Sequence, residues 1–200
     1  MTKLLELKNI SKTFPGVKAL QNVNLDLEAG EVLGLCGENG AGKSTLMKIL
    51  TGIYTADPGG QIWLEGRQVT VGGVAHAREL GLSIIHQELN MVPDLTVAQN
   101  LYLGRPGSHK SGWINDSKLN HEAAKLFERL GMNLDPTARI GDLSVARQQM
   151  VEIARALSYN SRILVMDEPT AALTVGETEA LFGMIRDFVT PSTGLIYISH

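Results

Sequence analysis

The chain has 200 residues, enough for one domain with a substantial hydrophobic core, and 44% of them are hydrophobic. Its net charge of −3 argues against a nucleic-acid partner, and its single cysteine excludes an internal disulfide. No apolar window approaches the roughly 18 residues that a membrane-spanning helix needs, and the N-terminus lacks the apolar stretch of a signal peptide. We therefore expect a soluble, intracellular protein, which can still lie against a membrane through a partner.

The first third of the chain alternates in the manner of β-strands. We predict strands at residues 4–10, 17–27 and 31–36, and a hairpin at 61–69 that turns at Glu65-Gly66. The third strand is a short apolar run, so we expect it to be buried and Cys36 to be a small core residue rather than a reactive thiol. A helix is predicted from Ser44 to Gly52.

From residue 75 on, strands are separated by helices. Helices are predicted at residues 75–80, 116–130, 145–157 and 176–189, and strands at 82–85, 162–166 and 195–199. This alternation favours an α/β fold with a mostly parallel sheet covered on both sides. The long helical stretch between the strands at 82 and 162 cannot be a simple crossover, so we expect it to form an inserted helical subdomain.

The segment Gly37–Ser44 fits the phosphate-binding pattern G-x-x-x-x-G-K-[ST]. Its glycines let the backbone curl so that N–H groups point at phosphate oxygens, and the following helix adds its positive end. Lys43 supplies a charge for the β- and γ-phosphates, and the hydroxyl of Ser44 can bind Mg²⁺. A solvated glycine-rich turn fits poorly between a strand and a helix, so we predict ATP binding. The expected contacts in this loop come from Gly37, Glu38, Asn39, Gly40, Ala41, Gly42, Lys43, Ser44 and Thr45.

Two acidic residues follow the apolar run at residues 163–166. A buried strand would deliver them to its carboxyl end, where ligands gather in open α/β sheets. Asp167 is then placed to hold Mg²⁺, and Glu168 to polarise the attacking water as a general base. The alternative is a solvated acidic turn, which the phosphate loop makes less favoured.

Three further residues are weaker candidates for the same site. Gln87 follows the strand at 82–85 and can reach Mg²⁺ and the attacking water, although glutamine there is more often a polar exit from the strand. His200 ends the strand at 195–199 and can contact the γ-phosphate or be structural. Phe14 can stack on adenine or simply cover the hairpin.

Taken in chain order, these motifs resemble the nucleotide-binding domain of ABC transporters over essentially the whole chain. The resemblance rests on the phosphate loop, Gln87, Leu143-Ser144, the stretch Asp167–Thr170 and His200. Longer stretches are similar to the importers of ribose, galactose, xylose and arabinose: Ile10–Leu20, Gly37–Lys48, His86–Asn90 and Gln148–Ala154. Their ATPase subunit usually carries two such domains in one chain, and this sequence is similar to the first.

The resemblance implies a P-loop NTPase fold with an N-terminal antiparallel β subdomain and a helical subdomain at about residues 90–158. It implies one domain over residues 1–200 that is truncated at its C-terminus. Phe14 would stack on adenine, and a second nucleotide-binding domain would complete the site. ATP hydrolysis would drive monosaccharide uptake through an integral-membrane permease, at the cytoplasmic face of the inner membrane, with a periplasmic sugar-binding protein as an indirect partner. The groove for the permease would include Leu89, Met91, Val92, Leu95 and Tyr102.

Two segments depart from the family pattern. The signature Leu-Ser-Gly-Gly-Gln here reads Leu143–Arg147, which keeps Ser144 as a γ-phosphate contact but loses both glycines. Thr174 stands where the family usually has an aspartate that crosses the dimer interface. We therefore expect the composite site that uses this signature to be the weaker one, and the site built on Lys43 and Glu168 to be competent.

Two other functions remain open. A non-transport ABC ATPase of the translation or DNA-repair type would show tandem domains with a charged linker or coiled-coil insertions, and neither is visible in the sequence. A regulatory module that binds nucleotide without hydrolysis would not need Lys43, Asp167, Glu168 and His200 together. Nothing in these motifs contacts a cargo, so we expect sugar specificity to reside in the permease and the sugar-binding protein.

Overall fold

The computed structural model describes residues 3–85, 91–104, 115–159, 161–170 and 173–199. The chain divides into two compact units. The first contains Met1–Gln87, Tyr159–Glu168 and Ile185–His200, and the second contains Glu88–Ser158 and Pro169–Met184. No helix in the described ranges is both long and apolar enough to cross a bilayer.

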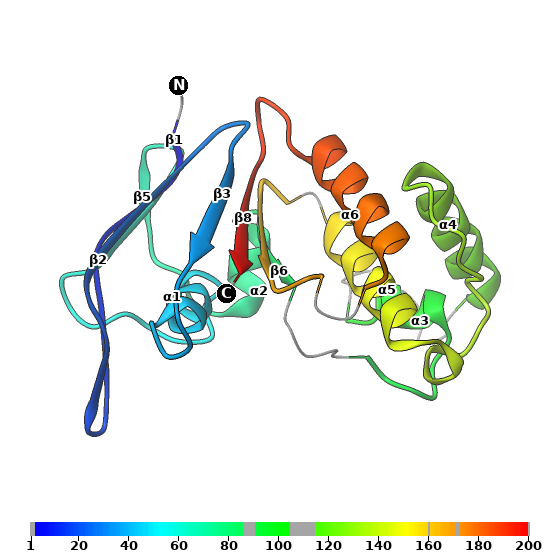
Figure 1. Cartoon of the computed structure of the whole chain (residues 1–200), viewed down its shortest axis with the longest axis horizontal. Coiled ribbons are helices and arrows are strands. Elements are labelled where there is room, and N and C mark those ends of the chain that lie inside the picture. The colour runs from blue at the N-terminus through cyan, green and yellow to red at the C-terminus, as the bar shows by residue number, and fades with distance from the viewer. Residues whose placement is uncertain (1–2, 86–90, 105–114, 160, 171–172, 200) are drawn as a thin grey trace. The chain divides into compact units, whose positions relative to one another are not determined.

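An antiparallel sheet forms the N-terminal part of the first unit (Figure 1). Its strands are β1 (Lys3–Phe14), β2 (Val17–Glu28), β4 (Gln61–Leu64) and β5 (Arg67–Val69), in the order β2-β1-β4-β5. The turn between β4 and β5 has positive φ at Glu65 (49°) and Gly66 (76°), as a tight two-residue hairpin turn requires. The predicted hairpin at residues 61–69 is therefore confirmed.

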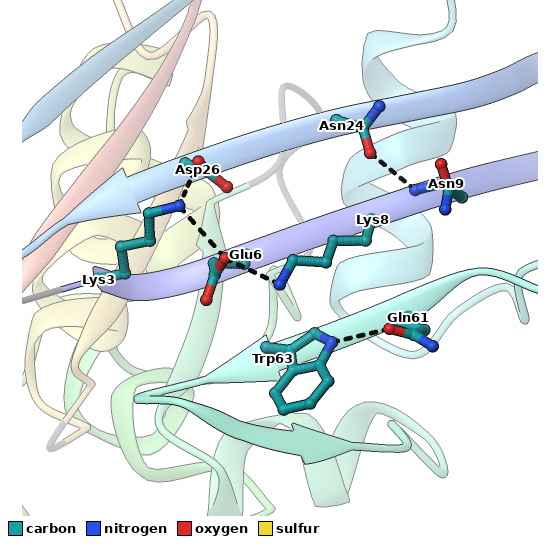
Figure 2. Close-up of polar contacts among 8 residues, drawn as sticks. All are labelled: Lys3, Glu6, Lys8, Asn9, Asn24, Asp26, Gln61 and Trp63. Carbon is teal, nitrogen blue, oxygen red and sulfur yellow. Dashed lines mark hydrogen bonds and ion pairs between the residues drawn. The ribbon is translucent and has the colours of Figure 1, made fainter.

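Charged and polar side chains connect the strands on the outer face of this sheet (Figure 2). Lys3 Nζ lies 2.7 Å from Asp26 Oδ2 and 3.2 Å from Glu6 Oε2, and Lys8 Nζ lies 3.0 Å from the same Glu6 oxygen. Hydrogen bonds from Lys8 and then Lys3 lower the pKa of Glu6. The indole of Trp63 donates to Gln61 beneath them. The contacts drawn on this face are polar, so the opposite face supplies the core.

A parallel sheet forms the second layer of strands in the same unit. Its members are β3 (Val32–Cys36), β6 (Leu82–Ile85), β7 (Ile163–Asp167) and β8 (Gly194–Ser199), in the order β3-β8-β7-β6. Helices α1 (Lys43–Leu50) and α2 (Val74–Glu79) belong to this unit, and one hydrophobic core joins α1, β7 and β8 to the antiparallel sheet. The predicted parallel sheet with helices between its strands is confirmed.

Strand β3 differs from the prediction. Its residues alternate between partly buried and exposed positions, so that Val32 is 49% exposed and Cys36 is exposed as well. The prediction that Cys36 is a core residue is therefore wrong. Strand β3 lies at an edge of the described sheet, and only the face that carries Leu33 and Leu35 packs on the core. An apolar run indicates burial, but it does not show whether both faces of the strand are covered.

The second unit is helical. It contains α3 (Val97–Tyr102), α4 (Asp116–Arg129), a short 3₁₀ turn at Ile140–Asp142, α5 (Val145–Leu157) and most of α6 (Val175–Phe188). These helices, apart from the end of α6, are drawn from green to orange in Figure 1. The core of this unit is built around the buried residues Val97, Leu101, Ala123, Phe127, Ile140 and Val151.

One buried polar side chain shapes the entry to α3. Asn100 is fully buried, and its Oδ1 accepts a hydrogen bond from Val92 N at 2.8 Å. Its amide donates to the carbonyl oxygens of Val92, Leu95 and Thr96. Thr96 and Gln99 form a capping box that begins the helix. The segment before α3 is thus held by hydrogen bonds to Asn100, together with backbone hydrogen bonds from Ile140 N to Leu95 O and from Gly141 N to Pro93 O.

Candidate nucleotide-binding site

A cavity of about 270 Å³ opens beside the phosphate loop in the first unit. The loop follows β3 and leads into α1, the start of β2 forms another wall, and the end of β7 reaches the same space. The cavity is lined by Val17, Lys18, Ala19, Glu38, Asn39, Gly40, Ala41, Gly42, Lys43, Ser44, Thr45, Asp167 and Glu168. Its size lies near the lower end of small-molecule sites.

Two glycines of the loop have different constraints. Gly40 and Gly42 have φ of 83° and 91°, in the left-handed region that glycine adopts most easily. A Cβ on Gly42 would lie 2.7 Å from both the carbonyl oxygen of Ala19 and Leu20 Cδ2, whereas one on Gly40 would meet no described atom within 4 Å. Gly42 therefore permits close packing of the loop on β2, whereas Gly40 is required by the backbone turn and not by packing.

The N-terminus of α1 is suited to an anion. Gly42 is its N-cap residue, and no described side chain caps the first turn. The first N–H groups of a helix have no partner within the helix, and they carry the positive end of its dipole. This positive end lies at the cavity, where Ser44 and Thr45 of the first turn contribute to the lining.

Lys43 curls back over its own loop. Its Nζ donates to the carbonyl oxygen of Gly37 and, at 3.1 Å, to that of Glu38. The lysine thus stays at the cavity, and carbonyl dipoles hold its positive charge there. Gly37 contributes this acceptor rather than a part of the cavity wall, since it is not among the lining residues.

The two predicted acids stand at the end of β7. The first four residues of the strand are buried, and Asp167 and Glu168 both line the cavity. Glu168 has φ of 47°, an unusual value for a residue with a Cβ, and its N–H donates to Ile198 O at 3.2 Å. Strained backbone of this kind is concentrated at functional sites. The structure therefore brings the acids together with Lys43 and Ser44.

Phe14 does not line the cavity among the residues that the structure describes. Its ring packs edge-to-face on Tyr54, with centroids 5.3 Å apart and an interplanar angle of 71°. The cavity wall next to it is Val17, which is 61% exposed and pairs with Phe14 across the β1–β2 hairpin. Val17, Lys18 and Ala19 were not predicted as site residues, because residues that begin a strand carry no recognisable signal of a binding site.

Gln87 and His200 are outside the described residues. Ser144 belongs to the second unit, where it is the N-cap of α5 and its hydroxyl accepts from Arg147 N at 3.4 Å. Thr174 precedes α6, and its N–H and hydroxyl both donate to Glu177 Oε2. The position that the family usually fills with aspartate thus has a local role in starting a helix.

The family model described as "ABC transporter" matches residues 20–171. The chain belongs to the ABC transporter family. This ABC domain is 54% identical over its full length to a ribose/galactose/methyl galactoside import ATP-binding protein of Albidiferax ferrireducens, of whose length it covers 40%. It is 52% identical, over 98% of its length, to another protein with this description from Burkholderia ambifaria, of which it covers 38%.

Solved ATP-binding cassettes have the same fold as this ABC domain. An ABC transporter cassette in its ADP conformation matches it with a TM-score of 0.84 and 28% identity, over 100% of this chain and 82% of that one. A dimeric cassette in a post-hydrolysis state with ADP and Pi matches it with a TM-score of 0.82 and 25% identity, over 98% and 88% of the two chains. The predicted P-loop NTPase fold is thereby confirmed.

Proposed function

We propose that this ABC domain binds ATP with Mg²⁺ in the cavity beside the phosphate loop and hydrolyses it. The observation that carries the proposal is the meeting of two groups of residues in one cavity. Lys43 and Ser44 come from the loop and α1, and Asp167 and Glu168 come from the end of β7. Phosphate-binding groups and acids from separate elements have no structural reason to converge, whereas phosphoryl transfer requires both.

Each residue has a distinct part in this proposal. The loop N–H groups and Lys43 bind the phosphates, and Lys43 exchanges its bonds to the loop carbonyl oxygens for phosphate oxygens. Ser44 and Asp167 hold Mg²⁺, which neutralises negative charge on the β- and γ-phosphates. Glu168 accepts the proton of the attacking water. Gln87 and His200 complete the site next to the γ-phosphate, and Phe14 stacks on adenine.

The transport role rests on the relatives, which are described as import ATP-binding proteins for ribose, galactose and methyl galactoside. We infer that this domain is part of an ATP-binding subunit that drives monosaccharide import. Its partners are an integral-membrane permease, a second nucleotide-binding domain and, indirectly, a periplasmic sugar-binding protein. It works at the cytoplasmic face of the inner membrane, and nucleic acid is not among its partners.

The helical region at about residues 90–158 is the proposed subdomain that faces the permease. Val92 is 39% exposed there, while Met91 and Tyr102 pack partly on the helical core. Leu95 and Leu89 complete the proposed groove, although Leu89 lies outside the described residues. We also propose that the composite site using Ser144 is the weaker of the two, because Val145 and Ala146 put side chains where the family has glycines.

The enzymatic proposal is tested with Glu168→Gln. This variant keeps the shape of the side chain but removes the base, so we expect ATP turnover to fall at least about 100-fold with ATP affinity retained. Glu79→Gln is the control, because Glu79 is an exposed acid on α2 that does not line the cavity. Substantial turnover in Glu168→Gln would contradict the assigned role.

The transport proposal needs the complete system. Proteoliposomes that contain the protein and its permease should accumulate a monosaccharide only under two conditions. ATP must be supplied on the side of the ATP-binding domain, and the sugar-binding protein on the opposite side. The Glu168→Gln protein should assemble equally well and transport nothing. ATP turnover that is indifferent to the permease, together with co-purification of ribosomes or DNA-repair proteins, would favour the non-transport alternative.

A further inference from the structure

The chain that leaves α1 is bonded to the last residues of β1. Ile53 N and Tyr54 N both donate to Lys48 O, at 2.8 and 3.0 Å, which fixes Tyr54 to the C-terminal end of the helix. Asp57 N donates to Ser11 O at 2.9 Å, near the far end of β1. The segment at residues 53–57 therefore connects the phosphate-binding helix to the β1–β2 hairpin.

Two aromatic rings and two lysines meet in this connection. Tyr54 packs edge-to-face on Phe14, as described above. Lys12 Nζ lies 5.5 Å from the centroid of the Phe14 ring, and Lys48 Nζ lies 5.7 Å from that of Tyr54. Both distances are within the range of cation–π attraction. The rings are thus stabilised as a pair by a cation from β1 and a cation from α1.

Lys12 has a second function in the same place. Its Nζ donates to Thr55 O at 2.7 Å and lies 4.0 Å from Asp57 Oδ1. One ammonium group therefore contacts the Phe14 ring and also binds the segment that carries Tyr54. These contacts define the position of Phe14 relative to α1. The hairpin alone would not fix this position, because a long two-stranded hairpin can bend.

The consequence reaches the cavity through Val17. Phe14 and Val17 are cross-strand partners at the end of the hairpin, and Val17 lines the cavity that the phosphate loop also lines. The contacts that Tyr54 and Lys12 make with Phe14 therefore also set the distance between this cavity wall and the phosphate loop. This wall comes from the hairpin, where the apolar residues Val17 and Ala19 flank Lys18. The apolar pair suits the nucleoside end of a ligand.

We propose that Tyr54 and Lys12 are positioning residues for the nucleoside end of the site: they hold the Phe14–Val17 pair in register with the phosphate loop, so that base and phosphates are bound by one rigid unit. The proposal rests on ATP binding in this cavity. The proposed stacking of Phe14 on adenine and the place of Val17 in the cavity wall both depend on this register, because the two residues are cross-strand partners.

The test compares two ligands on the intact protein. Titration calorimetry gives the Kd of Mg·ATP and of inorganic tripolyphosphate, which has the phosphates but no base. We expect Tyr54→Ala to weaken ATP binding about three- to tenfold, the range for loss of an aromatic pair, and tripolyphosphate binding less than about twofold. KM for ATP should rise by a similar factor with kcat at saturation nearly unchanged.

Three further variants keep the test decisive. Tyr54→Phe retains the ring and should restore the wild-type ATP affinity. Lys12→Met retains much of the stem but loses the cation, so it should give a smaller loss with the same preference for ATP over tripolyphosphate. Trp63→Ala is the control, because it removes an aromatic residue from the outer face of the antiparallel sheet in the same unit (Figure 2).

The outcomes distinguish failure of the positioning role from failure of ATP binding. Equal weakening of both ligands, or no weakening of either, in Tyr54→Ala and Lys12→Met would overturn the positioning role. If Tyr54→Ala does not fold, the Lys12→Met result decides alone. A wild-type protein that binds neither ligand would instead overturn the proposed function itself, and that result is obtained with the wild-type protein alone.

Discussion

Alanine substitution at Gly42 and Gly40 tests how tightly the phosphate loop is packed. The two glycines lie two residues apart and have similar left-handed backbone, so an alanine at either has a similar conformational cost. They differ in surroundings. A Cβ at position 42 approaches a backbone oxygen and a leucine methyl group at 2.7 Å, whereas the one at position 40 enters open space. The pair therefore separates backbone strain from steric conflict.

The expected magnitudes follow from these two terms. Left-handed backbone costs an alanine roughly 1–2 kcal/mol, partly offset by the lower entropy of its unfolded chain, so Gly40→Ala should lose about 1 kcal/mol. Gly42→Ala adds overpacking of about 1–3 kcal/mol, because the carbonyl oxygen of Ala19 belongs to β2 and cannot rotate away. A difference of about 2 kcal/mol between the variants corresponds to about 4–8 °C in Tm.

Thermal unfolding of the nucleotide-free protein is the appropriate assay, because bound ligand would add its own stabilisation. Gly42→Ala should unfold at the lower temperature and should also bind ATP more weakly, since the loop must shift to relieve the contact. Gly40→Ala should stay closer to the wild type in Tm. Equal Tm values for the two variants would refute the reasoning, because the steric term would then be absent.

Two further predictions concern the helical unit. Asn100→Ala should destabilise the protein by about 1–3 kcal/mol in urea unfolding, because Val92 and Leu95 lose their hydrogen bonds to a fully buried amide. Asn100→Asp should destabilise it at least as much, because a buried carboxylate oxygen would replace the NH2 group that donates to the carbonyl oxygens of Val92, Leu95 and Thr96. Full stability of either variant would contradict the assigned role of Asn100. Hydrogen bonds from Thr174 lower the pKa of Glu177, and the backbone N–H has a larger effect than the hydroxyl. The stability that these bonds contribute to the folded protein is fully present at neutral pH and is lost as pH falls through the lowered pKa. Glu177→Gln should therefore lower stability by less than about 1 kcal/mol at neutral pH and flatten its acid dependence, measured as Tm against pH; an unchanged acid profile would contradict this.

Local patterns predicted the elements of this fold well. Helix α5 occupies Val145–Leu157, as its periodicity predicts, and β6 occupies Leu82–Ile85. The phosphate loop and the acids after β7 could be brought together from the sequence alone, because both follow strands whose carboxyl ends meet at one edge of a parallel sheet. In each case the prediction rests on a periodic pattern or a motif within a few consecutive residues.

Other features could not be predicted, because they depend on which segments become neighbours. Cys36 lies in an apolar run, yet its exposure is decided by what covers one face of β3. Phe14 could be weighed only between two roles, since Tyr54 is far away along the chain and nothing local links the two rings. Val17 enters the site through its cross-strand pairing. Gln87 and His200 remain predictions.

The left-handed backbone at Glu168 has an evolutionary consequence. Folding does not favour glutamate there, because glycine would adopt the same backbone without strain. A mutation to glycine would relieve this backbone strain, so a selection that acted only on backbone strain would not preserve the glutamate. Under the proposed function, the carboxylate is retained because it is the base for the attacking water. In a lineage that stops using the site, position 168 should be among the first of the cavity residues to drift.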